Sequence, residues 1–400
     1  MMRLIIKHFH KLKKKINQLL SSKIENIFQS RAAINVTSPA LPPLREVLPL
    51  LKIIWMSKKV TNMGVFHKEF ESQLQKYLGA PHISLFSSGT SALITTLKSL
   101  ELEGEVITTP FSFIATINAI VWAGFKPVFV DIDKKSLNIN PELIEQRINH
   151  RTVAIVAVHC YGNPCDINSL IAICNKYKLK LIFDGAQAFD SKLNGKNIVN
   201  YGDMSILSFH ATKVFTTFEG GAIICQTLNQ KRKLDKLKNF GFNSQDDIDL
   251  IGLNFKMNEF CCLLGIIQLK YIKKYLKKRK LLAELYRQKL INSTGISLIE
   301  IESNHEINNS YFPILIEKDY LLSRDELISK LQIRGINLRK YFFPLLSNLK
   351  MYNHLDSSDL SNLPVANDIA NKVVCLPIYP DLKLKELKKI AHYINNPDEI

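Results

Sequence analysis

Short apolar runs alternate with helix-forming runs through much of this chain. The apolar runs carry few polar residues, which is typical of strands buried on both faces. The pattern predicts strands at Ile83–Phe86, Glu105–Thr108, Pro127–Val130, Val153–Val158, Lys180–Phe183, Ser205–Phe209 and Gly221–Cys225. It predicts helices at Thr90–Leu100, Ile114–Ala123, Pro141–Asn149 and Ile167–Tyr177. Such repeated units indicate an α/β fold with a mostly parallel sheet in a large domain.

The segments on either side of these units suggest how the chain divides. Its 400 residues favour two packed domains. Helices are expected at Leu44–Lys58 and Phe66–Leu78, and Met257–Leu290 reads as one long helix or a broken pair. A strand at Tyr311–Ile316 and helices at Ser323–Arg334 and Leu384–Asn395 indicate a smaller C-terminal α+β domain. We therefore expect an extension over residues 1–33, a large domain over 34–291 and a small domain over 292–400.

The extension is basic and has apolar residues at helical spacing, among them Ile5, Phe9 and Leu12. One interpretation is a helix that contacts an anionic membrane surface. A helix that is mobile or packs on a partner explains the pattern equally well. The first residues have no apolar run long enough for a secretory signal, so a cytoplasmic protein is expected.

The net charge of +17 raises the possibility of a nucleic-acid-binding protein. Only 11 of the 53 basic residues are arginine, the residue best suited to phosphate and base edges. No nucleic-acid partner is therefore expected. The seven cysteines form no CxxC pair and no zinc spacing, and several lie in apolar runs. They are interpreted as small core residues in a reducing compartment, and no metal site is predicted.

A single lysine, Lys213, follows the apolar run Met204–Phe209 and precedes Gly220 and Gly221. Ligands of parallel sheets gather at the carboxyl ends of the strands. A lysine in a turn at that edge is suited to hold a carbonyl cofactor as a Schiff base. Lys213 is therefore the candidate catalytic residue.

Other strand ends carry polar residues that suit such a cofactor. Gly89 and Thr90 open a helix after the strand Ile83–Phe86, where free N–H groups favour a phosphate, although the same residues could be a plain helix cap. Asp184 could pair with a pyridinium N–H or cap the next helix. Gln187 could hydrogen-bond a ring hydroxyl, and Ser208 could join the phosphate site.

Two further strand-end residues have ordinary explanations beside the functional ones. An aromatic side chain in Pro110–Phe113 could stack on a flat ring or belong to the core. His210 could line the site or simply pack. No GxGxxG and no GxxxxGK[ST] follows any of the expected strands, so a dinucleotide or P-loop site lacks support.

With these loops in order, the sequence resembles the DegT/DnrJ/StrS family of sugar aminotransferases from about Ser38 to the C-terminus. These are fold type I enzymes that use pyridoxal 5'-phosphate (PLP). The order of the matching stretches makes the resemblance specific. They are SSGTSAL (Ser87–Leu93), TTPFSFIATINAI (Thr108–Ile120), PVFVDID (Pro127–Asp133), VHCYGNPCDI (Val158–Ile167), DGAQAF (Asp184–Phe189), SFHATKVFTTFEGGAI (Ser208–Ile223), GLNFKMNEF (Gly252–Phe260) and LPIYP (Leu376–Pro380).

The resemblance implies a role for each residue around the cofactor ring. Lys213 would form the Schiff base, and Asp184 would pair with the pyridine nitrogen. Gln187 would contact the ring hydroxyl, and Phe113 would lie against the ring. Dehydratases of the family carry histidine where this chain has Lys213, so lysine favours transamination.

The resemblance also implies a phosphate site and a homodimer. Gly89, Thr90 and Ser208 would hold the phosphate. Asn254 would reach the phosphate of the neighbouring subunit, because family members are dimers with shared active sites. Many members have arginine where Lys256 stands and histidine where Phe189 stands, so the contacts at both positions stay open.

The reaction implied is amino transfer from L-glutamate to a keto carbon of a nucleotide-linked deoxyhexose. The matching stretches look most like enzymes that aminate C-4 of dTDP-4-keto-6-deoxyglucose for surface polysaccharide. Amination at C-3, a UDP- or GDP-sugar, and a non-catalytic regulatory relative are the alternatives. His210, Lys256, Arg339 and Tyr341 are candidate substrate contacts, and packing between domains is the alternative for Arg339 and Tyr341.

Overall fold

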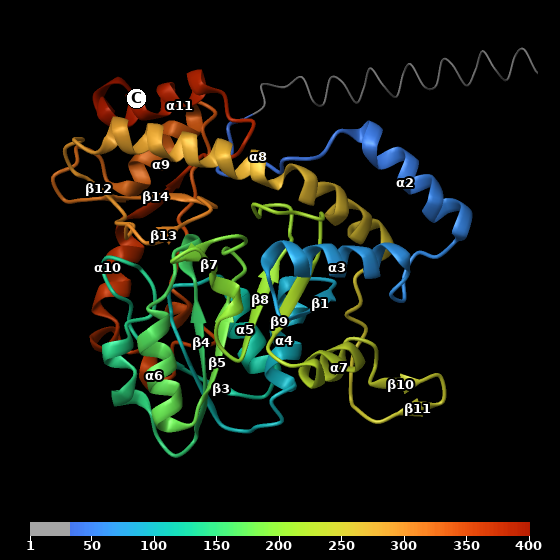
Figure 1. Cartoon of the computed structure of the whole chain (residues 1–400). Helices are drawn as coiled ribbons and strands as arrows, with labels where there is room; N and C mark the ends of the chain where they lie inside the picture. Colours follow the sequence, from blue (N-terminus) through green and yellow to red (C-terminus); the bar gives the residue numbers. More distant parts are fainter. Residues whose placement is uncertain (1–32) are drawn as a thin grey trace, which may run out of the picture.

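A seven-stranded sheet forms the centre of the fold in residues 33–400, the part of the chain that the computed structural model describes. Its strand order is β1–β9–β8–β5–β4–β2–β3 (Figure 1). Strand β9 is antiparallel to both neighbours, and the other paired strands are parallel. The predicted mostly parallel sheet is therefore confirmed. The strands are β1 (His82–Phe86), β2 (Glu105–Thr108), β3 (Lys126–Phe129), β4 (Thr152–Val158), β5 (Lys180–Asp184), β8 (Met204–Ser208) and β9 (Gly221–Cys225).

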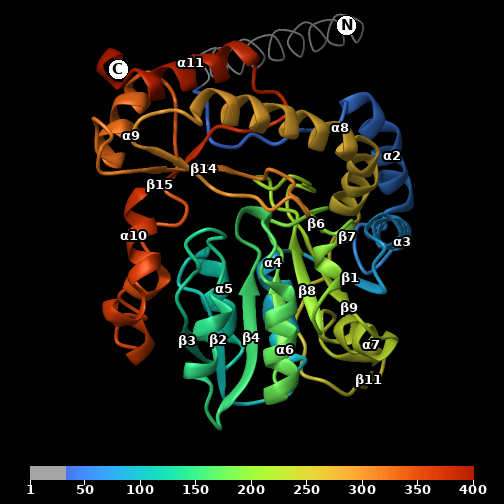
Figure 2. The same cartoon turned by 60° about the vertical axis from the view of Figure 1, so that its left-hand side comes forward.

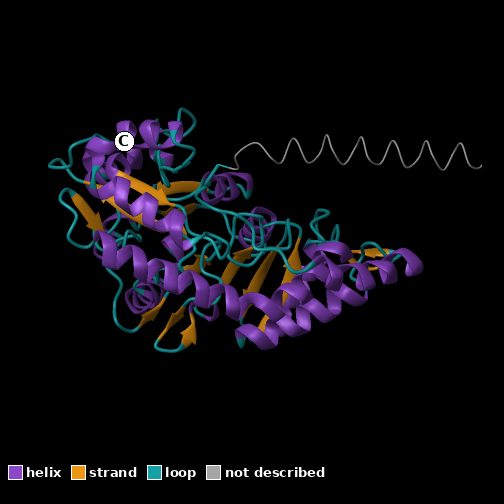
Figure 3. Cartoon of the chain, turned by 90° about the horizontal axis from the view of Figure 1, so that it is seen from above, coloured by secondary structure: helices purple, strands orange, loops and turns teal. Residues whose placement is uncertain are grey.

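Helices cover both faces of this sheet (Figure 3). Successive side chains of a strand point to opposite faces, so Leu181 and Phe183 enter one hydrophobic core and Ile182 enters the other. Both cores need apolar residues at every strand position, which explains the unbroken apolar runs. One face is covered by α3 (Val65–Leu78), α6 (Ile167–Tyr177) and α8 (Glu259–Leu290), the other by α4 (Gly89–Lys98), α5 (Ile114–Trp122) and α7 (Leu228–Leu237).

A second, antiparallel sheet lies in the C-terminal part of the chain (Figure 2). It has the strands β12 (Ile296–Leu298), β14 (Phe312–Ile316) and β15 (Val373–Leu376), and a third hydrophobic core lies between it and helices α9 (Arg324–Ile333) and α11 (Leu384–Asn395).

Helix α8 is one unbroken helix of 32 residues that serves both parts of the molecule. Its first half packs on α3 and on α2 (Leu44–Ser57). Its second half contributes Leu282 and Tyr286 to the core of the second sheet. The buried guanidinium of Arg279 donates to the carbonyl oxygens of Asn309 and Ile378 at 3.2 and 3.0 Å. The helix thus fixes the second sheet against the first.

Residues near the start of the described chain also contact its C-terminal part. Ile34 donates its N–H to Gly335 at 2.8 Å, and the N–H of Ile378 donates to the carbonyl of Val36 at 3.1 Å. The division into 34–291 and 292–400 stays a prediction, because both α8 and this segment contact the two halves. The extension lies outside the described residues except for its last one, and so do both interpretations given for it, the membrane contact and the mobile or partner-bound helix.

One expected helix is wrong. Residues 141–149 form two short 3₁₀ turns, Pro141–Leu143 and Glu145–Arg147, instead of an α-helix. Only Ile144 of this stretch is buried among apolar side chains, which is too little to stabilise an α-helix of this length. The Asn149 side chain instead donates to Glu105 at 2.9 Å.

Several elements escaped prediction, most of them strands of two or three residues whose apolar patterns are too brief to show a period. They are β6 (Lys192–Leu193), β7 (Lys196–Asn197), β10 (Phe242–Ser244), β11 (Asp247–Ile248), β12, β13 (His305–Glu306) and β15, together with helix α10 (Pro364–Lys372).

All seven cysteines are free and buried, as expected from their apolar surroundings. No helix within residues 33–400 combines the length and apolar character needed to cross a membrane.

The contact of α8 with α3 depends on a glycine. A Cβ at Gly265 would lie 2.5 Å from the ring of Phe70, which is itself fully buried. We expect Gly265→Ala to lower the free energy of unfolding by about 1–3 kcal/mol, because Phe70 has no room to move. Urea unfolding measures this value. Lys274→Ala, on the exposed side of α8, is the control and should change stability by less than about 0.5 kcal/mol. Equal effects of the two changes would contradict the packing argument.

Candidate active site

The predicted site residues lie at the carboxyl edge of the large sheet. Asp184 is the last residue of β5 and Ser208 the last residue of β8, its neighbour in the sheet. Across β8, β9 and β1, Ser208 pairs with Gly221, and Gly221 pairs with Phe86. The loop that follows β1 is therefore brought beside Ser208.

The loop between β1 and α4 has the geometry of an anion site. Ser88 caps α4, because its side chain accepts a hydrogen bond from the N–H of Ser91 at 3.0 Å. The other backbone N–H groups in the first turn of α4 have no partner within the helix and are open to a ligand. A Cβ on Gly89 would lie 2.7 Å from the Cβ of Ser208. A Cβ on Gly221 would lie 2.5 Å from the Ser88 carbonyl. Glycine is required at both positions for the loop to lie this close to the strand ends.

Asp184 is a buried carboxylate with two hydrogen bonds. Its Oδ2 accepts from the hydroxyl of Thr116 at 2.8 Å, and its Oδ1 accepts from the backbone N–H of Ala186 at 3.0 Å. Its side chain makes no salt bridge with residues 33–400. A carboxylate accepts about four hydrogen bonds, so Asp184 can still accept from a cationic N–H group. The second contact stabilises the turn that follows β5, and no helix of the described chain begins there, so the helix-cap interpretation of Asp184 is wrong.

Gln187 is held in the loop after β5. Its Oε1 accepts from the N–H of Tyr161 at 2.8 Å, while its amide nitrogen has no hydrogen-bond partner in the described part of the chain. Asn308 fixes the backbone of the same loop by donating to the carbonyls of Gln187 and Phe189 at 2.8 and 2.9 Å. Gln187 therefore presents a free N–H donor from a rigid loop.

Lys213 follows β8 in a tight turn, where its N–H donates to the carbonyl of His210 at 2.9 Å. Burial of the amine lowers the pKa of Lys213, and the negative charge of Asp184 raises it but only partly offsets the burial. The side chain is partly accessible, and its amine makes no hydrogen bond with residues 33–400. A lysine with a lowered pKa has more of the neutral, nucleophilic form near neutral pH.

The two aromatic residues of the stretch Pro110–Phe113 differ in their exposure to solvent. Phe111 is fully buried in the core, where it contacts Tyr161 and Phe342 edge to face. Phe113 is 54% exposed at the start of α5. Phe113 is thus free to contact a ligand, and its role stays a prediction.

Asn254 and Lys256 are the neighbours of Phe255, whose backbone contacts the β1–α4 loop. Their segment is tied to that loop because the N–H of Ser87 donates to the carbonyl of Phe255 at 2.8 Å. The side chain of Asn254 is exposed, and Lys256 donates to the Oδ1 of Asn239 at 2.7 Å. Neither side chain is shown to reach Lys213 of the same subunit.

The remaining candidate substrate contacts are placed less directly. His210 is exposed, with its Nε2 3.6 Å from a carboxylate oxygen of Glu219. Arg339 is exposed and lines a small cavity of about 440 Å³ together with Tyr341. Tyr341 packs edge to face on Tyr311, with ring centres 5.2 Å apart.

The structure also identifies residues that the sequence interpretation missed. Thr116 binds Asp184, and Tyr161 and Asn308 hold the Gln187 loop. Tyr311 is buried, and burial raises the pKa of its hydroxyl to about 12. A hydrogen bond with the hydroxyl of Thr212 acts in the opposite direction and lowers that pKa. Thr116 could have been found from its place in the first turn of a helix that begins at a strand end. Tyr161 lies in the loop after β4, at another strand end, and could have been found in the same way. Asn308 and Tyr311 come from distant segments, and no local pattern indicates them.

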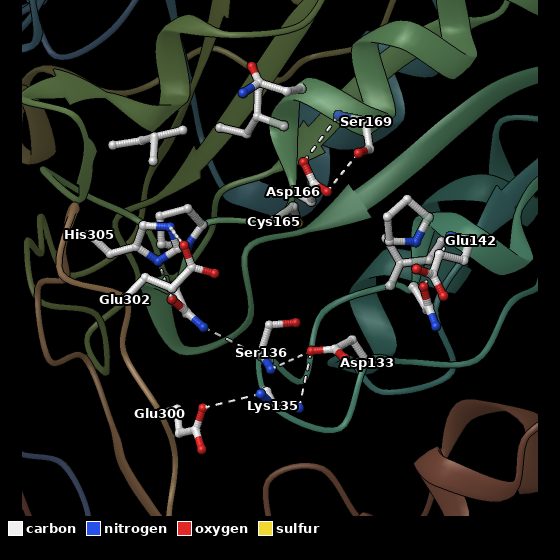
Figure 4. Close-up of a pocket in the computed structure, with 18 of the residues that line it drawn as sticks. Asp133, Lys135, Ser136, Glu142, Cys165, Asp166, Ser169, Glu300, Glu302 and His305 are labelled. Atoms are coloured by element: carbon white, nitrogen blue, oxygen red, sulfur yellow. Dashed lines mark hydrogen bonds and ion pairs between the residues drawn. The ribbon is translucent and has the colours of Figure 1, made fainter.

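A cavity of about 900 Å³ lies elsewhere, and neither Asp184, Gln187 nor Lys213 lines it (Figure 4). Many of its acidic side chains serve local structure. Asp133 accepts from the N–H groups of Lys135 and Ser136, and Asp166 caps α6 through Ser169. The cavity therefore contributes nothing to the site. No group of side chains able to hold a metal ion occurs in residues 33–400.

A lysine and a buried aspartate at the carboxyl edge of such a sheet, with an anion site beside them, define a PLP-dependent transferase. The sequence model of the DegT/DnrJ/EryC1/StrS aminotransferase family matches residues 45–395. The chain therefore belongs to this family of PLP-dependent sugar aminotransferases.

The relatives and solved structures agree with this assignment. The chain is 48% identical over 362 residues to the dTDP-4-amino-4,6-dideoxy-D-glucose transaminase of Shigella dysenteriae, covering 90% of this chain and 98% of the relative. The Escherichia coli enzyme of the same name is 45% identical, with 90% and 97% covered. The structure of DesI with its TDP-sugar product is 26% identical, with a TM-score of 0.87 and 92% and 94% of the chains covered. Helicobacter pylori PseC is 29% identical, with a TM-score of 0.86 and 92% and 99% covered.

The residues present fit PLP. The close approach of Gly89 and Ser208 leaves the start of α4 open for a phosphate. The buried carboxylate of Asp184, the free amide nitrogen of Gln187 and the Lys213 amine supply partners for a pyridinium, a ring hydroxyl and an aldehyde.

The contact of Gly89 with Ser208 leads to a prediction. We expect Gly89→Ala to weaken PLP binding by about tenfold or more, because the new Cβ displaces the loop from the strand end. Fluorescence titration of the PLP-free protein measures the affinity. The control is a double-mutant cycle with Ser208→Gly, which removes the clashing side chain. The double variant should bind PLP no more weakly than Ser208→Gly alone, and additive losses would contradict the steric explanation.

Proposed function

We propose that this protein transfers an amino group from L-glutamate to C-4 of dTDP-4-keto-6-deoxyglucose, forming a 4-amino-4,6-dideoxy sugar for surface polysaccharide. The observation that carries the proposal is the intact pair of Lys213 and buried Asp184 in a chain 45–48% identical to two enzymes named for this 4-amino sugar. The GDP-perosamine synthase of Vibrio cholerae, a relative that bears a GDP-sugar name, is 32% identical. The dTDP-sugar is therefore favoured over a GDP-sugar.

PLP supplies an aldehyde that accepts the amino group and a ring that stabilises negative charge on the reacting carbon. In our proposal Asp184 binds the pyridine nitrogen and keeps it protonated, and Gln187 donates to the ring hydroxyl. Phe113 lies against the ring. The helix start at Gly89 and Thr90, together with the Ser208 hydroxyl, holds the phosphate. The free donors and the close loop packing described above support these roles.

Lys213 has two tasks in this reaction. It binds the cofactor aldehyde, and once released it carries the proton between the cofactor carbon and the sugar carbon. Its lowered pKa supports the second task, because a base must be neutral before it can accept a proton. His210, Lys256, Arg339 and Tyr341 remain candidate contacts to the sugar or nucleotide. The seven free cysteines support a cytoplasmic location.

The proposal predicts one product from a defined panel. Purified protein with PLP, L-glutamate and dTDP-, UDP- or GDP-4-keto-6-deoxyhexoses should convert the dTDP-4-keto-6-deoxyglucose fastest, as read by mass spectrometry. Lys213→Ala should lose about 10⁴-fold or more in rate and still bind pyridoxamine phosphate, because the phosphate and ring contacts remain. Lys196→Ala, at an exposed lysine, is the control. Preference for a 3-keto or UDP-sugar would refute the assigned substrate, and near-normal turnover by Lys213→Ala would refute the assigned catalytic residue.

We further propose a homodimer in which Asn254 contacts the phosphate site of the other subunit. Large apolar side chains are exposed near this residue, with Ile251 99% and Leu253 54% exposed. Helix α2 adds Trp55 and Met56, which are 74% and 84% exposed. Helix α2 and the β10–β11 hairpin, which is close in sequence to Asn254, lie toward the same end of the molecule in Figure 1. Exposed apolar side chains of this kind mark an association surface.

A shared site can be tested by mixing two defective variants. Lys213→Ala and Asn254→Ala should each have little activity alone. After subunit exchange, half of the random dimers would carry one site with both residues intact, so the mixture should recover about a quarter of wild-type activity. Mixing Lys213→Ala with Gly89→Ala is the control, and it should recover no activity, because the proposed site draws both residues from the same subunit and each site of a mixed dimer would keep one defect. Absence of recovery with Asn254→Ala, in a mixture shown by mass to contain mixed dimers, would place Asn254 outside the partner's site.

A further inference from the structure

Two buried hydroxyl groups form a chain of hydrogen bonds that ends at the Asp184 carboxylate. The hydroxyl of Thr116 donates to the Oδ2 of Asp184 at 2.8 Å. The hydroxyl of Ser112 lies 2.7 Å from that of Thr116. Ser112 and Thr116 are 3% and 1% exposed, so water does not compete for either contact.

The direction of these hydrogen bonds follows from the number of hydrogens. A hydroxyl group has one hydrogen, and an ionised carboxylate only accepts. Thr116 therefore gives its hydrogen to Asp184, and Ser112 must donate to the oxygen of Thr116. Hydrogen bonds arranged in series polarise one another, so the contact of Ser112 strengthens the donation from Thr116 to Asp184.

Within residues 33–400, neither hydroxyl makes another hydrogen bond. The residue before α5 is Phe113, and no side chain caps the helix, so the hydroxyl of Ser112 does not serve as its cap. Threonine inside a helix often returns its hydrogen to a carbonyl one turn earlier, but the hydroxyl of Thr116 bonds to Asp184 instead. The first turn of α5 is therefore arranged around the carboxylate at the end of β5.

We propose that Ser112 and Thr116 are positioning residues that orient Asp184 and hold it as the charged partner of the cofactor's pyridine nitrogen. This inference rests on the role of Asp184 proposed above. Neither hydroxyl touches the cofactor, and both act through the carboxylate.

The consequence is electronic. Asp184 would hold the pyridine nitrogen of PLP, and a carboxylate without the Thr116 donor would support the positive charge on that nitrogen less strongly. PLP held in this way would withdraw fewer electrons, which would raise the pH midpoint of its visible absorbance change. Two other titratable groups interact with Asp184 electrostatically, namely Lys213 after β8 and Cys165 before α6. Neither changes when Thr116 is replaced.

The test is a spectroscopic pH titration of the PLP-loaded protein. In Thr116→Val the pH midpoint of the visible absorbance change should rise by about one unit, the size expected for losing one hydrogen bond to a charged group. The kcat value should fall by about tenfold, with KM for the sugar nearly unchanged. An unchanged midpoint in a PLP-loaded Thr116→Val protein would overturn the inference.

Three further variants separate the relay from a general structural effect. Thr116→Ser keeps the hydroxyl and should keep the wild-type midpoint. Ser112→Ala should raise the midpoint by less than Thr116→Val. The double variant should match Thr116→Val alone, because Ser112 acts only through Thr116. Additive shifts, or a Thr116→Ser midpoint as high as that of Thr116→Val, would contradict the relay. If Thr116→Val does not fold, Ser112→Ala decides the question by its midpoint.

The wild-type protein distinguishes failure of this inference from failure of the proposed function. A wild-type protein that shows no visible absorbance band with PLP lacks the proposed chemistry altogether. A wild-type protein with that absorbance and variants with unchanged midpoints would keep the proposed function and remove only the relay.

Discussion

The buried carboxylate of Asp184 is the constraint around which the active-site edge is organised. Removing an ionised carboxylate from water costs several kcal/mol unless other groups compensate. Here the compensation comes from the Thr116 hydroxyl and the N–H of Ala186, and the nearby Lys213 interacts with the carboxylate electrostatically. These groups belong to α5, the turn after β5 and the turn after β8. Three segments far apart in sequence must therefore meet correctly before the carboxylate is stable.

The second sheet stabilises the active-site edge of the large sheet through hydrogen bonds to backbone groups rather than through charged side chains at the site. Arg279 of α8 donates to carbonyls just before β14, and from that segment Asn308 donates to the loop that carries Gln187. The hydroxyl of Ser310 donates to the carbonyl of Tyr161 at 2.9 Å, and Tyr161 in turn donates its N–H to Gln187. Buried hydrogen bonds of this kind leave few alternative arrangements. The position of the Gln187 amide is thus set by residues more than a hundred positions away.

The sequence predicted the large sheet well because both of its faces are buried, which demands unbroken apolar strands. Strands β2 and β9 and helices α6 and α11 begin and end where they were expected. The same reasoning failed at residues 141–149, where helix-forming residues have only one deeply buried apolar contact. It also missed the two- and three-residue strands, since a period of two cannot be recognised in so few residues.

The candidate site was predictable where a residue lies directly at a strand end. Asp184, Ser208 and Gly89 are in or next to that position. Parallel pairing of β5 with β8 brings the first two together, while the loop with Gly89 reaches Ser208 across the antiparallel strand β9. Asn308 and Tyr311 lack such a signal, because their place depends on how the second sheet packs on the first. The same limit applies to Arg339 and Tyr341, whose distance from the reacting carbon depends on side-chain packing that no local pattern encodes.

Burial and the charge of Asp184 act in opposite directions on Lys213. Burial lowers the pKa of Lys213 and so favours the neutral, nucleophilic amine, while the negative charge of Asp184 raises that pKa and only partly offsets the effect of burial. The hydroxyls behind Asp184 support its charge without adding a positive charge beside Lys213. A cation in their place would stabilise Asp184 equally well, but it would compete with the pyridinium for that carboxylate. Neutral donors are therefore the suitable support for an aspartate whose remaining acceptor capacity must stay available to the cofactor.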